Sequence, residues 1–438
     1  MAYSLPAQEI PLNNDYDVIV AGGGPAGCAA AAAAAREGAK TLLVEVGGAL
    51  GGMGTQGLVP AWCPFTDGKK VVYRGLAEKV FRTVKDAMPH VRGGGDDWVA
   101  IDPERLKRVY DELVTGAGAD VLFNTFVTGV RPRPDNARAA DVIITANKAG
   151  LTAWRAKVFV DCTGDADLVA WLGGEYDKGG ENHELQGSTL CFILSNVDSY
   201  AYANQGRPNP NDPNNPIHRL PGDGKYPLLA DTHSCNSLLG AGTVGFNAGH
   251  LWDIDSTDPL TVSAGLVKGR QIAAEFRDAM AEYFPAAFGN AFLAATAPAL
   301  GVRESRRILG DYYLTVDDLK ACRDFPDNIG RNCYFIDVHR KDGGAEPFRF
   351  PEGKSHGIPY RSLLPAEIPN VIVAGRTLSS DRWANGSLRV MPVCLVTGEA
   401  AGTAAALAAA ANGDFRAVDT AALQKSLTAH GAFLYDAE

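Results

Sequence analysis

The stretch Asp17-Val-Ile-Val-Ala-Gly-Gly-Gly-Pro-Ala-Gly27 decides the fold of this 438-residue chain. Residues 18–21 are apolar and mostly β-branched, which predicts a buried strand, and an alanine-rich helix is expected over 26–37. In Gly22-x-Gly24-x-x-Gly27, the first glycine permits a tight turn, the second lets a pyrophosphate approach the backbone, and the third lets helix and strand pack closely. A second strand over 41–45 ends in Glu45, where a carboxylate accepts hydrogen bonds from an adenosine ribose. This context predicts an adenine dinucleotide site.

The same glycine pattern occurs again as Gly240-Ala-Gly242-Thr-Val-Gly245. No β-branched run precedes it, and residues 246–252 do not read as a long helix. We therefore favour a loop or strand edge in a substrate-binding region over a second nucleotide site. Without a second strand–turn–helix unit, no dedicated nicotinamide domain is expected.

The C-terminal part of the chain contains a segment similar to the first motif, Asn370-Val-Ile-Val-Ala-Gly-Arg376. This run predicts another buried strand, and we expect it to complete the same nucleotide site from the opposite end of the chain. A closing helix over 393–411 is rich in Ala and Gly, and its small side chains favour close packing against a sheet or a ligand.

Composition limits the class of protein. The chain is 46% hydrophobic with a formal charge of −10, so we expect two domains and neither a nucleic-acid nor an anionic membrane partner. The N-terminus lacks signal-peptide features, and the alanine tracts at 26–35 and 400–411 are too short and too weakly apolar to span a bilayer. Eight cysteines without CxxC pairs or zinc-like spacing indicate reduced thiols, no metal site and a cytoplasmic protein.

The order of patterns predicts an α/β fold with an insertion. Alternating runs at 121–130, 141–145 and 153–160 predict a small antiparallel meander beside a parallel sheet. The middle of the chain is richer in Pro, Asn and Asp, and contains a strand-like run at 188–194 and a helix over about 261–283. We expect a discontinuous Rossmann-type domain over 1–184 and 355–438, with an inserted α+β substrate domain over 185–354.

Taken together, the motifs resemble the FAD-dependent oxidoreductase family. That family belongs to the glutathione-reductase-like flavoproteins and is loosely related to the fumarate reductase and geranylgeranyl reductase groups. Beyond the first motif, the resemblance rests on five further segments: Gly51-Gly-Met-Gly-Thr55, Thr163-Gly-Asp165, Gly301-Val-Arg-Glu-Ser-Arg-Arg-Ile-Leu-Gly310, Ile358-Pro-Tyr-Arg361, and Val373-Ala-Gly-Arg376 through Gly398-Glu-Ala-Ala-Gly402. It spans nearly the whole chain and implies a Rossmann-type FAD-binding domain with FAD as cofactor.

The resemblance also implies roles for individual residues. The ADP half of FAD would be held by Gly22, Gly24, Gly27 and Glu45. Other FAD contacts would come from Gly52 and Thr55 on the flavin side, Val127 near the adenine, Thr163, Gly164 and Asp165 along the dinucleotide, and Gly375 and Arg376 at the ribityl chain. The N-terminus of the helix near Pro392 would face the pyrimidine edge of the flavin, where it stabilises negative charge. Many relatives carry an acid where Arg376 stands, which puts that ribityl contact in doubt.

The catalytic candidates start with the basic cluster Arg303, Arg306 and Arg307. A guanidinium there would anchor a polar or carboxylate-bearing substrate, or the cluster forms a helix face paired with Glu304. Three residues are candidates for the general base: His339, two residues after Asp337, and His356 and Tyr360, which flank the return to the flavin domain. His233 and His250 are weaker candidates. Cys63 follows the flavin-side loop, and an inert buried thiol is favoured there over a redox thiol.

These residues predict an FAD-dependent dehydrogenase or oxidase in which a small polar substrate, such as a sugar derivative or hydroxy acid, gives a hydride to flavin N5. One alternative is an NAD(P)H-fed reductase of activated double bonds, or a flavin monooxygenase. Another is an electron-transfer flavoprotein subunit without its own substrate. The electron acceptor, which a partner protein would supply in some of these schemes, has no sequence signal.

Overall fold

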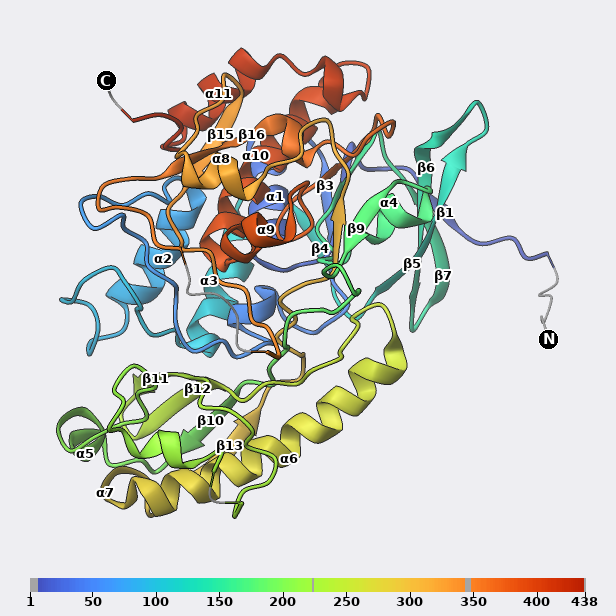
Figure 1. The fold of residues 1–438 in the computed structure, drawn as a ribbon. Helices are drawn as coiled ribbons and strands as arrows, with labels where there is room; N and C mark the ends of the chain where they lie inside the picture. The colour runs from blue at the N-terminus through green and yellow to red at the C-terminus, as the bar shows by residue number, and fades with distance from the viewer. Residues whose placement is uncertain (1–6, 223, 343–347, 437–438) are drawn as a thin grey trace.

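The computed structural model of this chain describes residues 7–222, 224–342 and 348–436 (Figure 1). At its centre lies a five-stranded parallel sheet in the order β17-β8-β2-β3-β4. Its strands are β2 (Val18–Ala21), β3 (Thr41–Val44), β4 (Asp120–Leu122), β8 (Val158–Asp161) and β17 (Val371–Val373). The N-terminal motif and the C-terminal Val-Ile-Val run therefore belong to one sheet, as predicted.

A second sheet is the predicted meander, in the order β1-β7-β6-β5. It contains β1 (Leu12–Asn13), β5 (Phe126–Arg133), β6 (Asn136–Asn147) and β7 (Gly150–Arg155), with antiparallel pairing from β5 through β7. Two of the three predicted strands, 121–130 and 153–160, were too long. Each of these segments contains parts of two strands that belong to different sheets. Residues 121–130 contain parts of β4 and β5, separated at Asn124, whose φ of 50° interrupts an extended strand. Residues 153–160 contain parts of β7 and β8.

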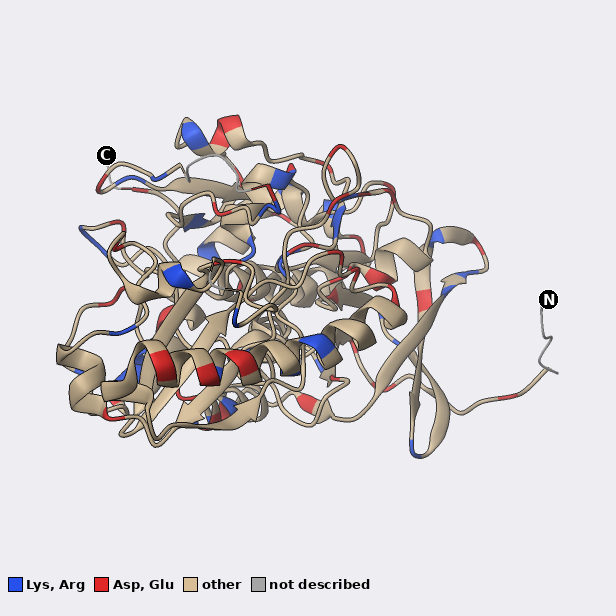
Figure 2. Ribbon diagram, turned by 60° about the horizontal axis from the view of Figure 1, so that its bottom comes forward, with Lys and Arg blue, Asp and Glu red and all other residues tan. Residues whose placement is uncertain are grey.

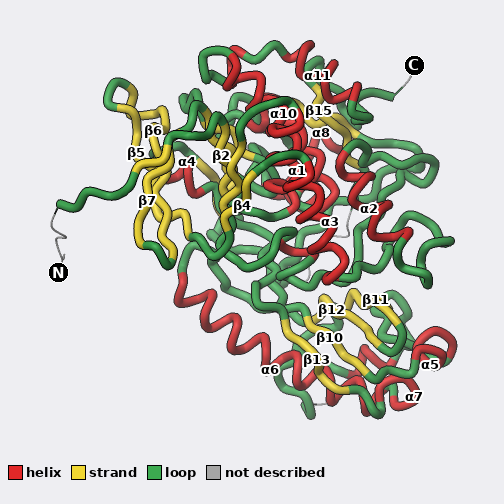
Figure 3. Tube along the Cα trace, turned by 180° about the vertical axis from the view of Figure 1, so that it is seen from behind, coloured by secondary structure: helices red, strands yellow, loops and turns green. Residues whose placement is uncertain are grey.

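Helices α1 (Pro25–Arg36) and α10 (Met391–Ala410) pack against each other beside the parallel sheet (Figure 3). Two glycines of α10 permit the close approach. A β-carbon would lie 2.2 Å from the Ala26 carbonyl oxygen at Gly398, and 2.1 Å from the Ala30 carbonyl oxygen at Gly402. The small residues of α10 thus bring its backbone directly against α1. Close packing was predicted, but with a sheet or a ligand as the partner rather than a helix.

Replacing Gly402 with alanine should destabilise the fold, because the added methyl group meets backbone of α1 rather than a movable side chain. Overpacking of this kind costs about 1–3 kcal/mol. The measurement is the free energy of unfolding by denaturant. Gly116→Ala is the matched control, since its β-carbon has no atom within 4 Å, and equal stability of the two variants would contradict this packing.

Helix α10 alone, among helices in the described residues, is long and apolar enough to cross a membrane, with a mean hydropathy of 1.5 over Met391–Ala410. The expectation that this region is too short and too weakly apolar to span a bilayer considered the 400–411 tract alone and left out the apolar residues 391–399 of the same helix. Within the fold, 89% of its most apolar window is buried. Its carboxylate, Glu399, pairs with Arg36 at 2.9 Å and accepts a hydrogen bond from the Leu76 N–H. These contacts identify α10 as a core helix of this structure.

The inserted region folds around a third sheet, in the order β11-β12-β10-β13 (Figure 1). Its elements are β10 (Phe192–Ser195), α5 (Ser199–Asn204), β11 (Ser234–Gly240), β12 (Thr243–Ala248), α6 (Pro259–Tyr283), α7 (Pro285–Phe288) and β13 (Phe292–Thr296). The second glycine motif spans the β11–β12 turn and is followed by a strand, so it is no nucleotide-binding turn. Acidic and basic segments are interspersed over the molecule (Figure 2).

Two hydrophobic clusters divide the chain. One gathers buried side chains from 190–300, and the other gathers those of the parallel sheet together with Ile308, Leu319, Ile329 and Ile336. We therefore propose that the inserted domain ends near residue 300 rather than at 354. The remaining elements are α2 (Leu76–Asp86), α3 (Pro103–Gly116), α4 (Asp167–Trp171), β9 (Tyr176–Lys178), β14 (Arg306–Ile308), α8 (Val316–Lys320), β15 (Asn328–Asn332), β16 (His356–Pro359), α9 (Arg382–Leu388) and α11 (Thr420–Ala429).

Candidate functional site

The glycine turn between β2 and α1 has the geometry of an anion-binding turn. Gly22 has a φ of 97°, and a β-carbon there would lie 2.4 Å from the Cys162 carbonyl oxygen. At Gly27 it would lie 1.8 Å from the Gly22 carbonyl oxygen, whereas at Gly24 it would meet no atom within 4 Å. Gly24 is the N-cap of α1. The open space therefore lies where the helix N-terminus favours a phosphate.

Glu45 follows β3 and organises the neighbouring loop. Its carboxylate accepts hydrogen bonds from Gly23 N–H at 2.7 Å and Gly47 N–H at 2.6 Å. The next glycine segment packs on the first, because a β-carbon on Gly52 would lie 3.0 Å from the Gly24 α-carbon. Thr55 donates its hydroxyl proton to the Leu50 carbonyl at 2.6 Å.

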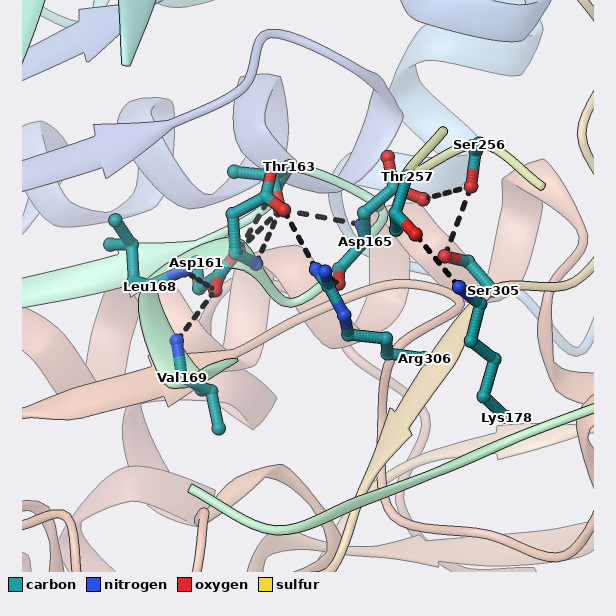
Figure 4. A network of polar contacts seen from close by, with 12 residues as sticks. Asp161, Thr163, Asp165, Leu168, Val169, Lys178, Ser256, Thr257, Ser305 and Arg306 are labelled. Atoms are coloured by element: carbon teal, nitrogen blue, oxygen red, sulfur yellow. Dashed lines mark hydrogen bonds and ion pairs between the residues drawn. The ribbon is translucent and has the colours of Figure 1, made fainter. Parts of the chain in front are cut away.

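The loop 163–165 joins three parts of the chain (Figure 4). Thr163 donates a hydrogen bond from its hydroxyl to Asp161, a buried carboxylate whose pKa is raised to about 6 by burial and by Asp167. Gly164 adopts a φ of 80°. The Asp165 carboxylate accepts hydrogen bonds from Ser256 at 2.6 Å and from Arg376 at 3.1 Å. This loop therefore ties the parallel sheet to the inserted region.

Arg376 is occupied with backbone and with Asp165. It donates to the carbonyls of Gly164 at 2.6 Å and Val302 at 3.0 Å, and it forms the ion pair with Asp165. Many relatives carry an acid at the position of Arg376. In this chain the position is basic, and the acid lies on the facing loop as Asp165. Gly375 has a φ of 89° and a Cβ position only 3.2 Å from the Ala26 side chain, so it lies against the first turn of α1.

Val127 lies in β5 and is half-buried. It is two residues after Thr125, whose N–H donates to the Glu45 carbonyl at 3.1 Å. The candidate FAD residues from the glycine turn, Glu45, Val127, the 163–165 loop and the 375–376 turn are therefore brought together by neighbouring strands of the fold. Helix α10 begins at Met391, one residue before the expected Pro392.

Arg303 differs from its two neighbours in the basic cluster. Arg307 pairs with Glu304 at 2.6 Å and Arg306 pairs with Asp167 at 2.9 Å, so both are held in ion pairs. The expected helix face is wrong, because both residues lie in strand β14. Arg303 is 6% exposed and donates only to uncharged acceptors: the Gly187 carbonyl at 2.5 Å, the Thr189 hydroxyl at 2.9 Å and the Asn247 amide oxygen at 3.2 Å. Burial and Arg389 lower its pKa to about 10, which leaves it charged at neutral pH.

His339 is linked to Arg303 through one residue, Gly187. The Gly187 N–H donates to the His339 carbonyl at 3.3 Å, while the Gly187 carbonyl accepts from Arg303. His339 Nε2 lies 3.2 Å from Asp337, and Asp337 accepts from Arg389 at 3.2 Å. Arg389 lies two residues before α10. His339 is therefore connected, through Asp337 and Arg389, to the N-terminus of α10, which is the helix end that we expect to face the flavin.

His233 and His250 join His339 in one cluster, which we call the histidine cluster. His250 Nε2 lies 2.8 Å from His339 Nδ1, and His250 Nδ1 lies 2.8 Å from Asp231. Burial lowers the pKa of His233 and, with Arg303, lowers that of His339 to about 3. For Asp337, His339 and the arginines outweigh burial and lower the pKa.

His356 and Tyr360 are not part of this cluster. His356 is fully buried in β16, where Nδ1 faces the Gly357 carbonyl at 2.9 Å and Nε2 faces the Asn332 amide at 2.9 Å. Burial lowers its pKa to about 4. Tyr360 donates to the Phe415 carbonyl at 3.0 Å, and burial raises its pKa. Interior partners already occupy their polar atoms, so the structure places both residues in the core, outside the histidine cluster.

Sequence reasoning placed Asp337 beside His339, which the structure confirms, but it missed Asp231 and underrated His233 and His250. A usable signal was present in the repeated triplets Asp231-Thr-His233 and Asp337-Val-His339, although Asp231 pairs with His250 rather than His233. Arg389 carried no recognisable pattern. The thiol of Cys63 is buried, and burial raises its pKa well above the ordinary value, which agrees with the inert interpretation.

The geometry defines a Rossmann-type dinucleotide-binding oxidoreductase, and comparison with known families agrees. The family model described as FAD dependent oxidoreductase matches residues 17–427. The chain belongs to this family, it is an enzyme, and FAD is its cofactor. Three features of the structure fit bound FAD: the open position at Gly24, the glycine turns without side chains, and the N-terminus of α10. The comparison with curated proteins gave no match.

Solved structures with a similar fold are distant in sequence. A geranylgeranyl bacteriochlorophyll reductase-like protein from Thermoplasma acidophilum is 14% identical, with a TM-score of 0.48, over 96% of this chain and 83% of that chain. An anhydrotetracycline hydroxylase, OxyS from Streptomyces rimosus, is 14% identical, with a TM-score of 0.41, over 94% and 65%. The p-nitrophenol 4-monooxygenase PnpA from Pseudomonas putida DLL-E4 is 11% identical, with a TM-score of 0.42, over 97% and 82%. At these values, none of them indicates the reaction of this chain.

Proposed function

We propose that this FAD-dependent oxidoreductase is a dehydrogenase or oxidase of a small polar substrate that carries a hydroxyl and a carboxylate, such as a hydroxy acid or an acidic sugar derivative. When bound, FAD supplies a hydride acceptor for the substrate carbon. The observation that carries the proposal is Arg303, a buried cation beside the histidine cluster. Among the described residues it forms no ion pair, although the charge of Asp337 lies near enough to act on it.

The residues that would hold FAD are those that the fold brings to the carboxyl ends of the parallel strands. The open position at Gly24 and the α1 N-terminus would accept the pyrophosphate, and Glu45 would accept the ribose hydroxyls. The N-terminus of α10 would stabilise negative charge on the ring. Assignments for Gly52, Thr55, Val127, Gly375 and Arg376 remain part of this proposal.

Arg303 would bind the substrate carboxylate. A buried charge is costly unless an opposite charge accompanies it, and the other two arginines buried to a similar degree among the described residues, Arg307 and Arg331, both have carboxylate partners. Arg303 has three neutral acceptors instead. A substrate carboxylate would complete this site, and the planar guanidinium would orient the substrate.

Next to this anchor, the histidine cluster would take the hydroxyl proton. The loss of a hydride from an alcohol carbon requires that this proton leave, and a positioned acid–base group contributes about 10²–10⁴-fold to the rate. His339 is the sequence candidate that lies beside Arg303, through Gly187.

Replacing His339 with asparagine should slow anaerobic flavin reduction by substrate by about 100-fold or more, with bound FAD unchanged. Stopped-flow absorbance at the flavin band measures the rate. His218→Asn is the matched control, because His218 is exposed and its Nε2 atom faces the backbone carbonyl of Asp212. Wild-type reduction rates in the His339 variant would remove the cluster from the chemistry.

A further inference from the structure

We propose that His233, His250 and His339 bind one divalent transition-metal ion of the class to which Zn²⁺ belongs. One potential ligand nitrogen from each residue lies within 4.8 Å of the other two. The three residues come from different segments: just before β11, just after β12, and the loop beyond β15. Three imidazoles are an established ligand set for such ions and leave a fourth position open.

The carboxylates around the cluster are arranged as outer partners of metal ligands. Asp231 lies on Nδ1 of His250, and Asp337 lies on Nε2 of His339, so the other nitrogen of each ring faces inward. Metal-bound histidines usually donate their outer N–H to such a carboxylate. The structure therefore assigns His250 Nε2 and His339 Nδ1 as ligand atoms.

Counting hydrogen atoms supports a cation at this position. Three contacts run from Asp231 through His250 and His339 to Asp337, yet two neutral imidazoles carry only two N–H groups. If each ring donates its hydrogen outward to its carboxylate, the two inner nitrogens face each other as acceptors at 2.8 Å. A metal ion between them removes this conflict without a third proton on the buried pair, and the metal content of the purified protein distinguishes the two arrangements. At a Zn–N distance of about 2.0 Å, a tetrahedral ion needs these atoms to separate to about 3.3 Å.

His233 supplies the third ligand. Its Nδ1 atom is buried and has no hydrogen-bond partner among the described residues. Its ring stacks on that of His250, with centroids 4.3 Å apart, and lies edge-on to that of His339 at 5.1 Å, so it must turn to aim a nitrogen at the shared ion. The positive charges of Arg303 and Arg389 disfavour binding of a metal cation at the histidine cluster. The negative charges of Asp231 and Asp337 favour it and offset the two arginines. The metal site goes beyond the proposed function and would change how the proton leaves. With both nitrogens of His339 occupied, the bound ion would lower the pKa of a coordinated substrate hydroxyl, and His339 would serve as a ligand of that ion rather than as the base itself.

The test is metal content and metal affinity, measured without substrate. The FAD-bound protein is purified, analysed by mass spectrometry of its metals, stripped with a chelator and titrated with Zn²⁺. We expect about one Zn²⁺ per FAD, lost in His233→Ala and His250→Ala with FAD retained. His218→Ala should bind as wild type does. Asp231→Asn should weaken Zn²⁺ binding by about 10–100-fold, since it removes an outer partner.

Two results would overturn the proposal: wild-type protein that neither contains nor binds stoichiometric Zn²⁺, or binding that survives in both histidine variants. Retained FAD in the variants reports that the fold is intact, and His233→Gln replaces any alanine variant that loses FAD. Since neither assay uses a substrate, a failure here leaves the proposed oxidation standing, and a failure of the oxidation leaves the metal result standing.

Discussion

Replacing Gly24 with alanine is expected to give a folded protein that has lost most of its FAD. The alanine β-carbon meets no protein atom within 4 Å, and the backbone at this N-cap has a φ of −68° that alanine adopts readily. The methyl group would instead occupy the space assigned to the pyrophosphate. Overpacking by one methyl costs about 1–3 kcal/mol, which corresponds to roughly 5- to 150-fold weaker FAD binding. The measurement is FAD affinity of the deflavinated protein by fluorescence titration.

Gly27→Ala provides the contrast. Its β-carbon would lie 1.8 Å from the Gly22 carbonyl oxygen, which is backbone that cannot move aside cheaply. This variant should lose folded protein as well as FAD, whereas the Gly24 variant should keep its unfolding temperature. Gly116→Ala serves as the neutral control. Wild-type FAD affinity in the Gly24 variant would mean that the pyrophosphate does not approach this turn.

The second large effect is expected at Arg303. Changing it to glutamine removes the charge and the planar fork while keeping polarity, so kcat/KM for a carboxylate-bearing substrate should fall by about 10- to 150-fold, the equivalent of a charged hydrogen bond of about 1.5–3 kcal/mol. FAD content should not change. An uncharged analogue of the same alcohol should lose far less, because it makes no ion pair with the wild-type enzyme.

Two further variants test whether Arg303 binds the substrate carboxylate or only stabilises the fold. Arg303→Lys keeps the charge but not the bidentate geometry, and should restore part of the discrimination between charged and neutral substrates. Arg155→Gln, which breaks a surface pair with Asp141, should leave the kinetics unchanged. An equal loss for the charged and neutral substrates in Arg303→Gln would show that this residue only supports the fold.

The fold was predictable where local patterns are strong. The β2–α1 turn, Glu45 and the C-terminal strand each have a recognisable residue pattern, and parallel strands bring such segments together at one edge of a sheet. Strand boundaries in the meander were not predictable. At Asn124 the chain passes from the parallel sheet to the meander, but the run of strand-forming residues on both sides shows no break in the sequence. The closing helix was predicted over 393–411 and is observed over Met391–Ala410.

The catalytic side of the site depended on tertiary contacts that the sequence does not encode locally. His250 and His339 are 89 residues apart and meet at 2.8 Å, and no spacing rule anticipates that. Proximity to the flavin domain favoured His356, yet β16 buries it completely. Three arginines in five residues looked equivalent, and only the positions of Glu304 and Asp167 distinguish Arg303 from Arg306 and Arg307.

The most direct test of the central claim is the anaerobic absorbance of the bound flavin after addition of NADH, NADPH or a panel of hydroxy acids and acidic sugars. The account predicts a flavin that stays oxidised with either nicotinamide and bleaches with a carboxylate-bearing alcohol. Rapid bleaching by NADH or NADPH would contradict it and favour a reductase or monooxygenase.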